Sequence, residues 1–480
     1  AIRQERNSMV FSSAVFVFGF MPLLLFLYFL AAPKYRNYIL LIFSLIFYGW
    51  GGVNYLLLML AVVMSDYVFA IAIAQIKTQK IRKLFVVFSV VVNLGVLGYY
   101  KYTNFFIENI NHFIKNDIKI ATIVLPIGIS FFTFQAMSYV IDVYRGDVAA
   151  QKNPFYVMLY VSLFPQLVAG PIVRYKTVEN EIEHRQIHME DVADGLERFI
   201  LGFAKKIIIA NNVGALADKI FEMNSIDMPL AWLGAVAYTL QIYFDFSAYS
   251  DMAIGLGRVF GFHFEENFNF PYIAKSVGDF WRRWHISLTT WFRDYVYIPL
   301  GGNRKGMPRM YVNMFIIWTL TGIWHGAEWN FILWGMYYFV FQAIEKLFLG
   351  KWLAKIPRVF QHIYTMFVVT LGWVLFRCDS GLSQCVTWFK ALFSGHVTSE
   401  GMSLLHMYAV QYGVYLVLGV ILSMPIYRVL KAAVYKRIQK NRICKWACAA
   451  AGYAVLLALF YVSVLYLVNS TYNPFIYFRF

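Results

Sequence analysis

A histidine inside a long apolar run is the residue best suited to chemistry in this 480-residue sequence. His325 lies within Tyr311–Phe348, which reads YVNMFIIWTLTGIWHGAEWNFILWGMYYFVFQAIEKLF. Imidazole takes up and returns protons near neutral pH, and polar groups at membrane depth are costly enough that most of them serve a function. The sequence therefore predicts general acid–base chemistry at His325.

The run around His325 is longer than one membrane crossing requires. At about 1.5 Å per residue it extends well beyond the ~30 Å hydrocarbon layer. Gly322, Gly326 and Asn330 bracket the histidine, so we expect the helix to break there and to place His325 at the tip of two half-helices. Both flanks of the run are basic, which favours a re-entrant hairpin with its two ends in the cytoplasm.

A second group of candidate residues lies in FWRRWHISLTTWFRDYVYIPLGGNRKG at 280–306. Alternating tryptophans and arginines are typical of an anchor at the lipid headgroup level. The functional alternative is a basic funnel for the phosphates of an acyl-coenzyme A or an acyl-carrier prosthetic group. His285 adds a titratable group that an anchor does not need. The candidate donor- or substrate-binding residues are Arg282, Arg283, Trp284, Arg293, Asp294, Asn303, Arg304, Lys305, Trp324 and Asn330.

Composition predicts an all-α, polytopic transmembrane helix bundle. Hydrophobic residues make up 60% of the chain and charged residues 14%, against roughly 25% charge in soluble domains. About 11–12 apolar segments recur along the chain, some of them short or re-entrant. Residues 1–8 are expected to be a leader, and 9–480 a single membrane domain with no large soluble domain.

The net charge of +16 is interpreted as membrane topology, and nucleic acid is not an expected partner. Basic residues gather in short connections, which the positive-inside bias assigns to the cytoplasm: Lys77–Lys83, Arg282–Arg309, Lys346–Arg358 and Lys431–Lys445. The first apolar segment is too long for a cleaved signal peptide. Arg174–Arg198 is expected to form an amphipathic helix along the inner interface, with His184 and His188 on one solvated face.

The sequence offers little for a metal site, and none is expected. The four cysteines lie in two groups, Cys378 with Cys385 and Cys444 with Cys448. No histidine completes a tetrahedral metal site with either group, so roles in packing are favoured. Gly257 and Gly261 are expected at a close helix contact. Pro126 and Gly128 are expected to kink their helix.

Carboxylates inside apolar segments leave two alternatives open. Asp66, Asp142, Asp245 and Asp251 could form a proton path, which would fit a proton-coupled transporter of polysaccharide or lipid. Hydrogen bonds between helices are the simpler explanation, and we favour them.

The two chemical blocks, in their order, resemble the membrane-bound O-acyltransferase family. The resemblance covers nearly the whole chain. It is carried by the 280–306 block, LTGIWHGAEWNFILWG at 320–335, LFPQLVAGPIVRY at 163–175 and LQIYFDFSAYSDMAIGLGRVFGF at 240–262. It is strongest to the bacterial polysaccharide branch, which holds the membrane subunit of alginate O-acetyltransferase. It implies a ring of helices around a central tunnel, with His325 as the essential histidine and His285 as a second one facing the same tunnel.

The resemblance implies transfer of an acyl group, most simply acetyl, from a cytoplasmic thioester to a hydroxyl group on an extracellular or cell-wall polysaccharide. Acetyl-coenzyme A or an acyl-carrier thioester would be the donor, with no bound cofactor. Expected partners are membrane lipids, the donor and a periplasmic or extracellular acyltransferase, in a multi-pass protein of a bacterial inner membrane. His325 would act as general base, or second in rank as a covalent acyl carrier. Open alternatives are D-alanyl transfer to teichoic acid, long-chain acyl transfer, transport and a purely structural role in export.

Overall fold

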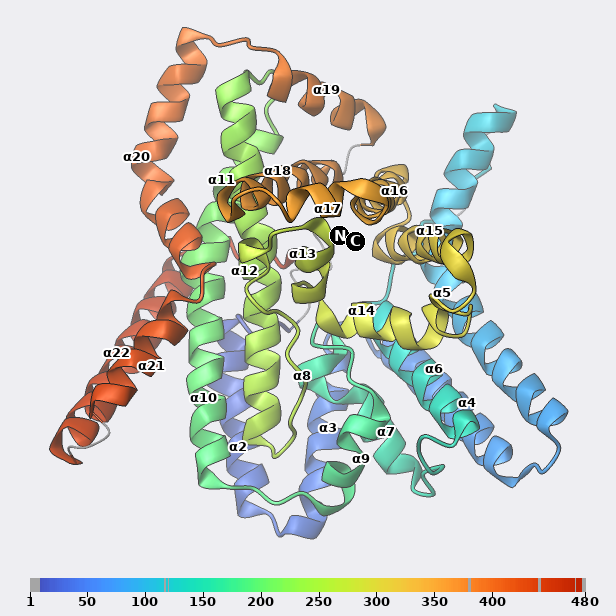
Figure 1. The fold of residues 1–480 in the computed structure, drawn as a ribbon. Helices are drawn as coiled ribbons and strands as arrows, with labels where there is room; N and C mark the ends of the chain where they lie inside the picture. The colour runs from blue at the N-terminus through green and yellow to red at the C-terminus, as the bar shows by residue number, and fades with distance from the viewer. Residues whose placement is uncertain are drawn as a thin grey trace. The chain divides into compact units, whose positions relative to one another are not determined.

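The computed structural model describes residues 9–115, 118–119, 121–378, 381–438, 442–470 and 472–476. The expected leader at 1–8 lies outside these ranges. Every regular element in the described ranges is helical, which confirms the all-α class (Figure 1). The chain forms two compact units, Ala1–Phe199 with Ser250–Glu265 and Tyr477–Phe480, and Ile200–Tyr249 with Glu266–Ile476.

The first unit is built from helices that pack both against sequence neighbours and against helices further along the chain. α3 packs against α2, α4 and α7, while α6 packs against α4 and α5. The elements are η1 (Phe16–Phe20), α2 (Met21–Leu30), η2 (Pro33–Tyr35), α3 (Arg36–Gly49), α4 (Val53–Gln75), α5 (Gln79–Ile114), α6 (Ile129–Arg145), α7 (Pro154–Ser162), α8 (Phe164–Leu167), α9 (Tyr175–His184), most of α10 (Met189–Ala204) and the end of α12 (Met228–Val259).

The second unit holds both candidate histidines. Its elements are the end of α10, η3 (Lys205–Ala210), α11 (Asn211–Phe221), most of α12, η4 (Pro271–Ile273), α13 (Val277–Arg283), α14 (Ile286–Phe292), η5 (Arg293–Tyr297), α15 (Gly306–His325), α16 (Trp329–Ile344), η6 (Glu345–Leu349), α17 (Gly350–Leu353), α18 (Arg358–Arg377), α19 (Leu382–Phe393), α20 (Ser399–Leu422), α21 (Ile426–Ile438) and α22 (Arg442–Asn469).

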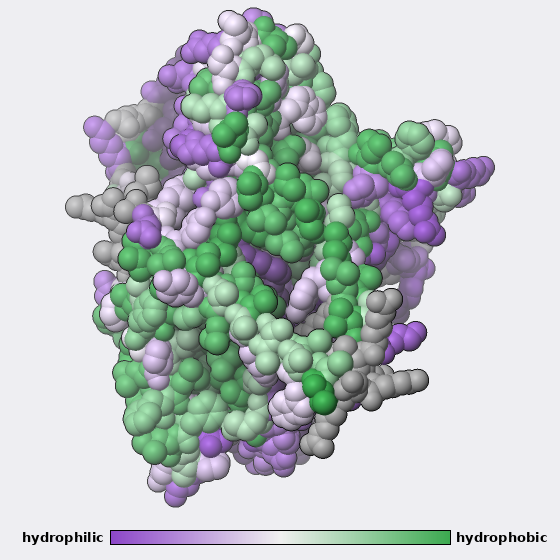
Figure 2. Space-filling view, turned by 90° about the vertical axis from the view of Figure 1, so that its left-hand side faces the viewer, coloured by the Kyte–Doolittle hydropathy of each residue, from purple (hydrophilic) through white to green (hydrophobic). Residues whose placement is uncertain are grey.

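Seven helices in the described ranges are long and apolar enough to cross a membrane. They are Val53–Gln75, Gln79–Ile114, Met189–Phe221, Trp329–Leu353, Arg358–Arg377, Ser399–Leu422 and Ile443–Asn469. Figure 2 shows a face of the molecule on which hydrophobic residues cover most of the surface. Large apolar side chains such as Val410, Val414 and Leu457 are exposed, as expected for helices that face lipid.

The long run around His325 folds as a helical hairpin. α15 ends at His325 and α16 begins at Trp329, and the two helices pack closely along their length. Glycines allow that approach, because a Cβ at Gly335 would lie 2.3 Å from the carbonyl oxygen of Trp318 and one at Gly322 would lie 2.4 Å from that of Phe331. The predicted break is confirmed, and it falls at Gly326 and the two residues after it.

Several local predictions are wrong. The Arg174–Arg198 segment is not one helix, because the extended residue Arg185 ends α9 and a new helix starts at Met189 within a candidate membrane span. His184 therefore ends one helix while His188 lies outside it, and the two share no helical face.

The expected kink at Pro126 and Gly128 is also absent, because α6 begins only at Ile129 and Gly128, with φ +74°, precedes it. Gly257 and Gly261 both have close neighbours, although they are not part of one helix-packing motif. A Cβ at Gly257 would lie 2.7 Å from the Phe264 ring, whereas Gly261 has φ +81° and lies just beyond the end of α12 at Val259. The N–H of Phe262 donates to the Gly257 carbonyl and that of Gly261 to Arg258, which is a Schellman motif.

The carboxylates within apolar segments bond to other helices and segments. Asp66 of α4 accepts hydrogen bonds from the Ser89 hydroxyl at 2.6 Å and the Asn93 amide at 2.8 Å, both on α5. Asp245 lies 2.6 Å from the Lys206 ammonium, and Asp251 lies 2.9 Å from the Arg198 guanidinium. The simpler explanation, bonds between helices, is therefore confirmed at these three positions.

Candidate active site

The backbone at His285 is held in a strained conformation by a neighbouring loop. His285 separates α13 from α14 and has φ +45°, in the left-handed region that costs energy for any residue with a Cβ. The loop before α13 pairs with this break, because the Ile286 N–H donates to the Asn267 carbonyl at 3.0 Å and the Asn269 N–H donates to the Arg283 carbonyl at 2.9 Å. Strain that is maintained in this way is common at functional sites.

Asn267 also orients the His285 ring. Its side-chain oxygen lies 3.1 Å from Nδ1 of His285 and accepts hydrogen bonds from the Ser287 hydroxyl at 2.9 Å and the Ser287 N–H at 3.3 Å. Since the hydroxyl and the N–H both donate to this atom, we assign it as the amide oxygen. An amide oxygen only accepts, so Nδ1 carries the proton and Nε2 keeps a lone pair in the neutral ring.

Burial keeps this imidazole neutral. His285 is 1% exposed, and desolvation lowers the pKa of its ring well below the usual range. The His285 ring lies edge-to-face with the ring of Phe246 on α12, with the two centroids 4.7 Å apart. A neutral ring with a lone pair at Nε2 can accept a hydrogen bond from a substrate hydroxyl.

His325 lies in an aromatic enclosure at the end of α15. Its ring is 7% exposed and lies edge-to-face with Trp324 at 4.9 Å, Trp334 at 5.0 Å and Phe376 at 5.2 Å between centroids. These rings come from α15, α16 and α18, so the position of His325 depends on three helices. Dry aromatic walls exclude water, which strengthens electrostatic interactions inside such a site.

Trp324 links the two histidines. Its ring centroid lies 5.9 Å from His285 and 4.9 Å from His325. Asn330, in the first turn of α16, is fully buried beside this group, and its amide donates to the Phe376 carbonyl at 3.5 Å. The structure therefore brings together four residues selected from the sequence: His285, His325, Trp324 and Asn330.

Other selected residues lie elsewhere or have structural partners. Trp284 packs in an aromatic cluster, 4.7 Å from Trp373. Arg283 bonds to Asp279 at 3.2 Å and to the Asn269 carbonyl, while Arg293 pairs with the adjacent Asp294 at 2.7 Å.

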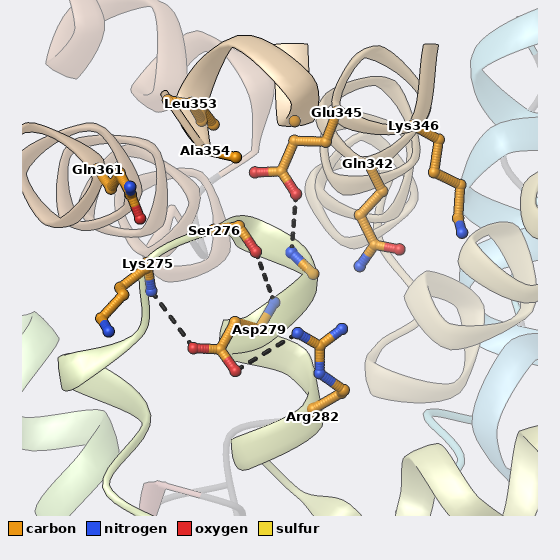
Figure 3. Close-up of a pocket in the computed structure, with 12 residues that line it drawn as sticks. Lys275, Ser276, Asp279, Arg282, Gln342, Glu345, Lys346, Leu353, Ala354 and Gln361 are labelled. Carbon is orange, nitrogen blue, oxygen red and sulfur yellow. Dashed lines mark hydrogen bonds and ion pairs between the residues drawn. The ribbon is translucent and has the colours of Figure 1, made fainter. Parts of the chain in front are cut away.

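The glycine-rich turn forms as expected, with positive φ at Gly301, Gly302 and Gly306. Within this turn, Asn303 accepts a hydrogen bond from the Tyr297 hydroxyl, and Arg304 and Lys305 are exposed. Arg282 is also exposed, and it lines a cavity of about 430 Å³ together with Lys275 and Lys346 (Figure 3).

Sequence reasoning missed Asn267, Trp334 and Phe376. Asn267 precedes its histidine by 18 residues in an irregular loop, where no periodicity indicates a contact. Trp334 lies within the 320–335 block that carries the family resemblance, but its residue type alone does not distinguish it from the other aromatic residues of the block. Phe376 lies on α18, and its sequence distance from His325 gives no signal.

Comparison with known proteins decides the family. A family model for the membrane-bound O-acyltransferase family matches residues 150–380, which include both histidines. The probable alginate O-acetylase AlgI of Pseudomonas aeruginosa is 45% identical over 80% of this chain and 75% of its own length. The AlgI protein of Azotobacter vinelandii is 39% identical over 98% of this chain and 100% of its own length. The chain belongs to the membrane-bound O-acyltransferase family.

Membership in this family confirms the resemblance drawn from the motif blocks. The protein is a multi-pass membrane enzyme that transfers acyl groups to oxygen. A third relative, the peptidoglycan O-acetyltransferase of Helicobacter pylori, is 33% identical over 83% of this chain and 82% of its own length. The names of these relatives denote O-acetylation of alginate in two cases and of peptidoglycan in the third.

Proposed function

We propose that this protein transfers an acetyl group from a cytoplasmic thioester to a hydroxyl group destined for an extracellular or cell-wall polysaccharide. The observation that supports it most is that the Trp324 ring contacts both His285 and His325, within the segment that the family model matches. The donor is acetyl-coenzyme A or an acyl-carrier thioester. The protein works in a bacterial inner membrane with a periplasmic or extracellular acyltransferase as partner.

His325 acts as the general base. It takes the proton from the acceptor hydroxyl while the oxygen attacks the thioester carbonyl carbon, so that a C–O bond forms and the C–S bond breaks. The imidazolium then returns its proton to the departing thiolate, which leaves as a neutral thiol. The aromatic enclosure supports this role because it excludes water from the reacting groups.

His285 orients the acceptor. Its assigned tautomer presents the Nε2 lone pair, so it can accept the hydrogen bond of a hydroxyl group. The other role predicted from the sequence, donation of a proton to the developing oxyanion, is less well supported, because burial lowers the pKa of this ring. A neutral ring with Nδ1 bonded to Asn267 has no proton at Nε2 to donate.

Acetyl is the acyl group that the comparisons favour. The relatives named as O-acetylases or O-acetyltransferases reach 45% identity and cover most of this chain. D-alanyl transfer to teichoic acid remains the second candidate. The transporter alternative loses support because Asp66, Asp245 and Asp251 each bond to a neighbouring helix.

The decisive experiment follows label from acetyl-coenzyme A into the partner or polymer with purified protein in vesicles. The wild type should transfer acetyl, and His325→Ala should abolish transfer while the protein stays folded in the membrane. The matched control is His362→Ala, because His362 of α18 lies outside the enclosure and contacts the Ala274 carbonyl. Wild-type activity in His325→Ala would end the proposal.

A further inference from the structure

The helix that supplies Phe376 to the His325 enclosure ends in a buried arginine. Arg377 is the last residue of α18 and directly follows Phe376, whose ring centroid lies 5.2 Å from that of His325. An arginine at the end of a membrane helix commonly extends toward the lipid headgroups. The Arg377 side chain is only 6% exposed, so it is directed into the protein instead.

Asp218 of α11 is the ionic partner of this arginine. The Arg377 guanidinium donates through Nη2 to Oδ1 of Asp218 at 2.9 Å, and the Asp218 side chain is 10% exposed. The guanidinium also lies over the rings of Phe221 on α11 and Tyr238 on α12, at 5.1 Å and 5.8 Å from their centroids. The ion pair and the two cation–π contacts therefore hold the end of α18 against α11 and α12.

The second carboxylate oxygen of Asp218 is also engaged. Oδ2 accepts a hydrogen bond from the Tyr472 hydroxyl at 2.7 Å. With a partner on each oxygen, the carboxylate has a fixed rotation and presents Oδ1 to Arg377 in one direction. A buried ion pair contributes little net stability compared with well-packed apolar side chains. The geometry that the pair imposes on α18 is therefore its more informative property.

The last turn of α18 depends on contacts of this kind. The final carbonyl groups of a helix have no partners within the helix, and helix ends fray unless other groups hold them. α18 ends at Arg377, because Cys378 has φ −71° and ψ 76° and leaves the helical conformation. The Asn330 amide donates to the Phe376 carbonyl at 3.5 Å, which is a long contact. The ion pair at 2.9 Å is the stronger hold on this turn.

A shift of this turn would reach His325 through one ring. The Phe376 ring lies edge-to-face with Phe331 at 5.0 Å between centroids, and its centroid lies 5.1 Å from that of Trp334 and 5.2 Å from that of His325. Protein interiors are close-packed, so a displaced ring moves its neighbours. The position of the imidazole therefore depends on a carboxylate of α11 that does not contact it.

We propose that Asp218 and Arg377 are positioning residues for His325: their ion pair holds the last turn of α18, and with it the Phe376 ring, against the imidazole. Neither side chain takes part in a bond-making step. The inference rests on the proposed acyl transfer, in which His325 is the general base. Without the pair, the imidazole would adopt orientations in which its lone pair does not face the acceptor hydroxyl.

The test measures kcat and KM for acetyl transfer in the full-length protein. Asp218→Asn removes the charge and preserves the shape of the side chain. It should lower kcat about tenfold and leave the KM for acetyl-coenzyme A unchanged, because misplacement of a catalytic group slows the chemical step. Arg377→Lys keeps the charge but loses the planar guanidinium, and it should lower kcat about threefold. This second variant carries the test if Asp218→Asn does not fold.

Asp227→Asn is the matched control. Asp227 is a carboxylate of the same unit that is 5% exposed, and it accepts hydrogen bonds from the Thr398 hydroxyl at 3.0 Å and the Thr398 N–H at 3.2 Å, at the start of α20. Its replacement weakens a buried polar contact away from the His325 enclosure. The control should lower the Tm in detergent and leave kcat unchanged.

A double-variant cycle identifies the route of the effect. Phe376→Leu removes the ring that joins the end of α18 to His325. If Asp218 acts through this ring, Asp218→Asn should lower kcat by about twofold or less in the Phe376→Leu background, because the two changes then share one effect.

Three results would overturn the inference. The first is a pair of folded variants, Asp218→Asn and Arg377→Lys, that both have wild-type kcat. The second is an equal loss of kcat from Asp218→Asn in the wild-type and Phe376→Leu backgrounds. The third is an equal loss of kcat in Asp227→Asn, which would reduce the effect to stability. An active His325→Ala enzyme would instead remove the proposed function, so the two failures are distinguishable.

Discussion

The Nδ1 atom of His285 lies 3.1 Å from the side-chain oxygen of Asn267. This contact fixes which ring nitrogen carries the proton, and burial lowers the pKa so that the ring stays neutral. A residue in an irregular loop thereby sets the chemical form of a histidine 18 positions further along the chain.

Asn267→Asp should make activity sensitive to acid. A carboxylate beside Nδ1 stabilises the imidazolium and raises the pKa of His285. The wild-type ring is neutral at physiological pH because its pKa is lowered, whereas the variant would lose the neutral ring as pH falls through the raised pKa. The measurement is kcat/KM for acetyl transfer against pH, in which the acidic limb should move to higher pH.

The control for this variant is Asn269→Asp, which adds the same charge at an exposed position two residues away. It should leave the pH profile unchanged. An Asn267→Asp profile that coincides with the wild type would show that His285 does not need to be neutral for transfer.

Much of the catalytic hairpin could be predicted from the sequence, whereas the contacts that orient it could not. Gly326 after His325 indicates a helix end, and the helix ends there. The break at His285 gives no such signal, since Trp284 and His285 are neither glycine nor proline. It depends on the pairing of 283–286 with Asn267 and Asn269, which only the folded chain reveals. The cavity at Lys275 was missed for the same reason, because its cations come from segments far apart in sequence.

Gly335→Ala should separate the two helices of the hairpin. The added Cβ would lie 2.3 Å from the backbone carbonyl of Trp318, which cannot move without shifting α15. Overpacking of this kind typically costs about 1–3 kcal/mol, and here it also displaces His325 at the end of α15. We expect a lower Tm in detergent and a loss of acetyl transfer of at least tenfold. Gly98→Ala on α5 is the control, because no atom lies within 4 Å of its added Cβ, and an equal loss there would contradict the packing argument.

Asp66→Asn should leave acetyl transfer largely intact. Asp66 bonds to Ser89 and Asn93 between α4 and α5, and the amide keeps an oxygen that can accept from Ser89. A structural bond between helices predicts a modest stability loss of about 1 kcal/mol and near-normal turnover. A proton path would require a titratable group at this position. Abolished acetyl transfer in a variant with normal stability would therefore contradict a purely structural role for Asp66.

Lys206 and Asp245 form a buried ion pair that should be strongly coupled. Their charged atoms lie 2.6 Å apart, both side chains are less than 5% exposed, and Asp245 also accepts a hydrogen bond from the Ile476 N–H at 2.7 Å. Lys206 donates to the Pro474 carbonyl, so the pair fixes the 472–476 segment.

Lys206→Met alone leaves a buried carboxylate without its cation and should lower the free energy of unfolding by about 3–5 kcal/mol. Lys206→Met with Asp245→Leu removes both charges and should recover part of that loss. Unfolding of the wild type, both single variants and the double variant gives the coupling energy. Strictly additive losses would mean that the two charges do not stabilise each other.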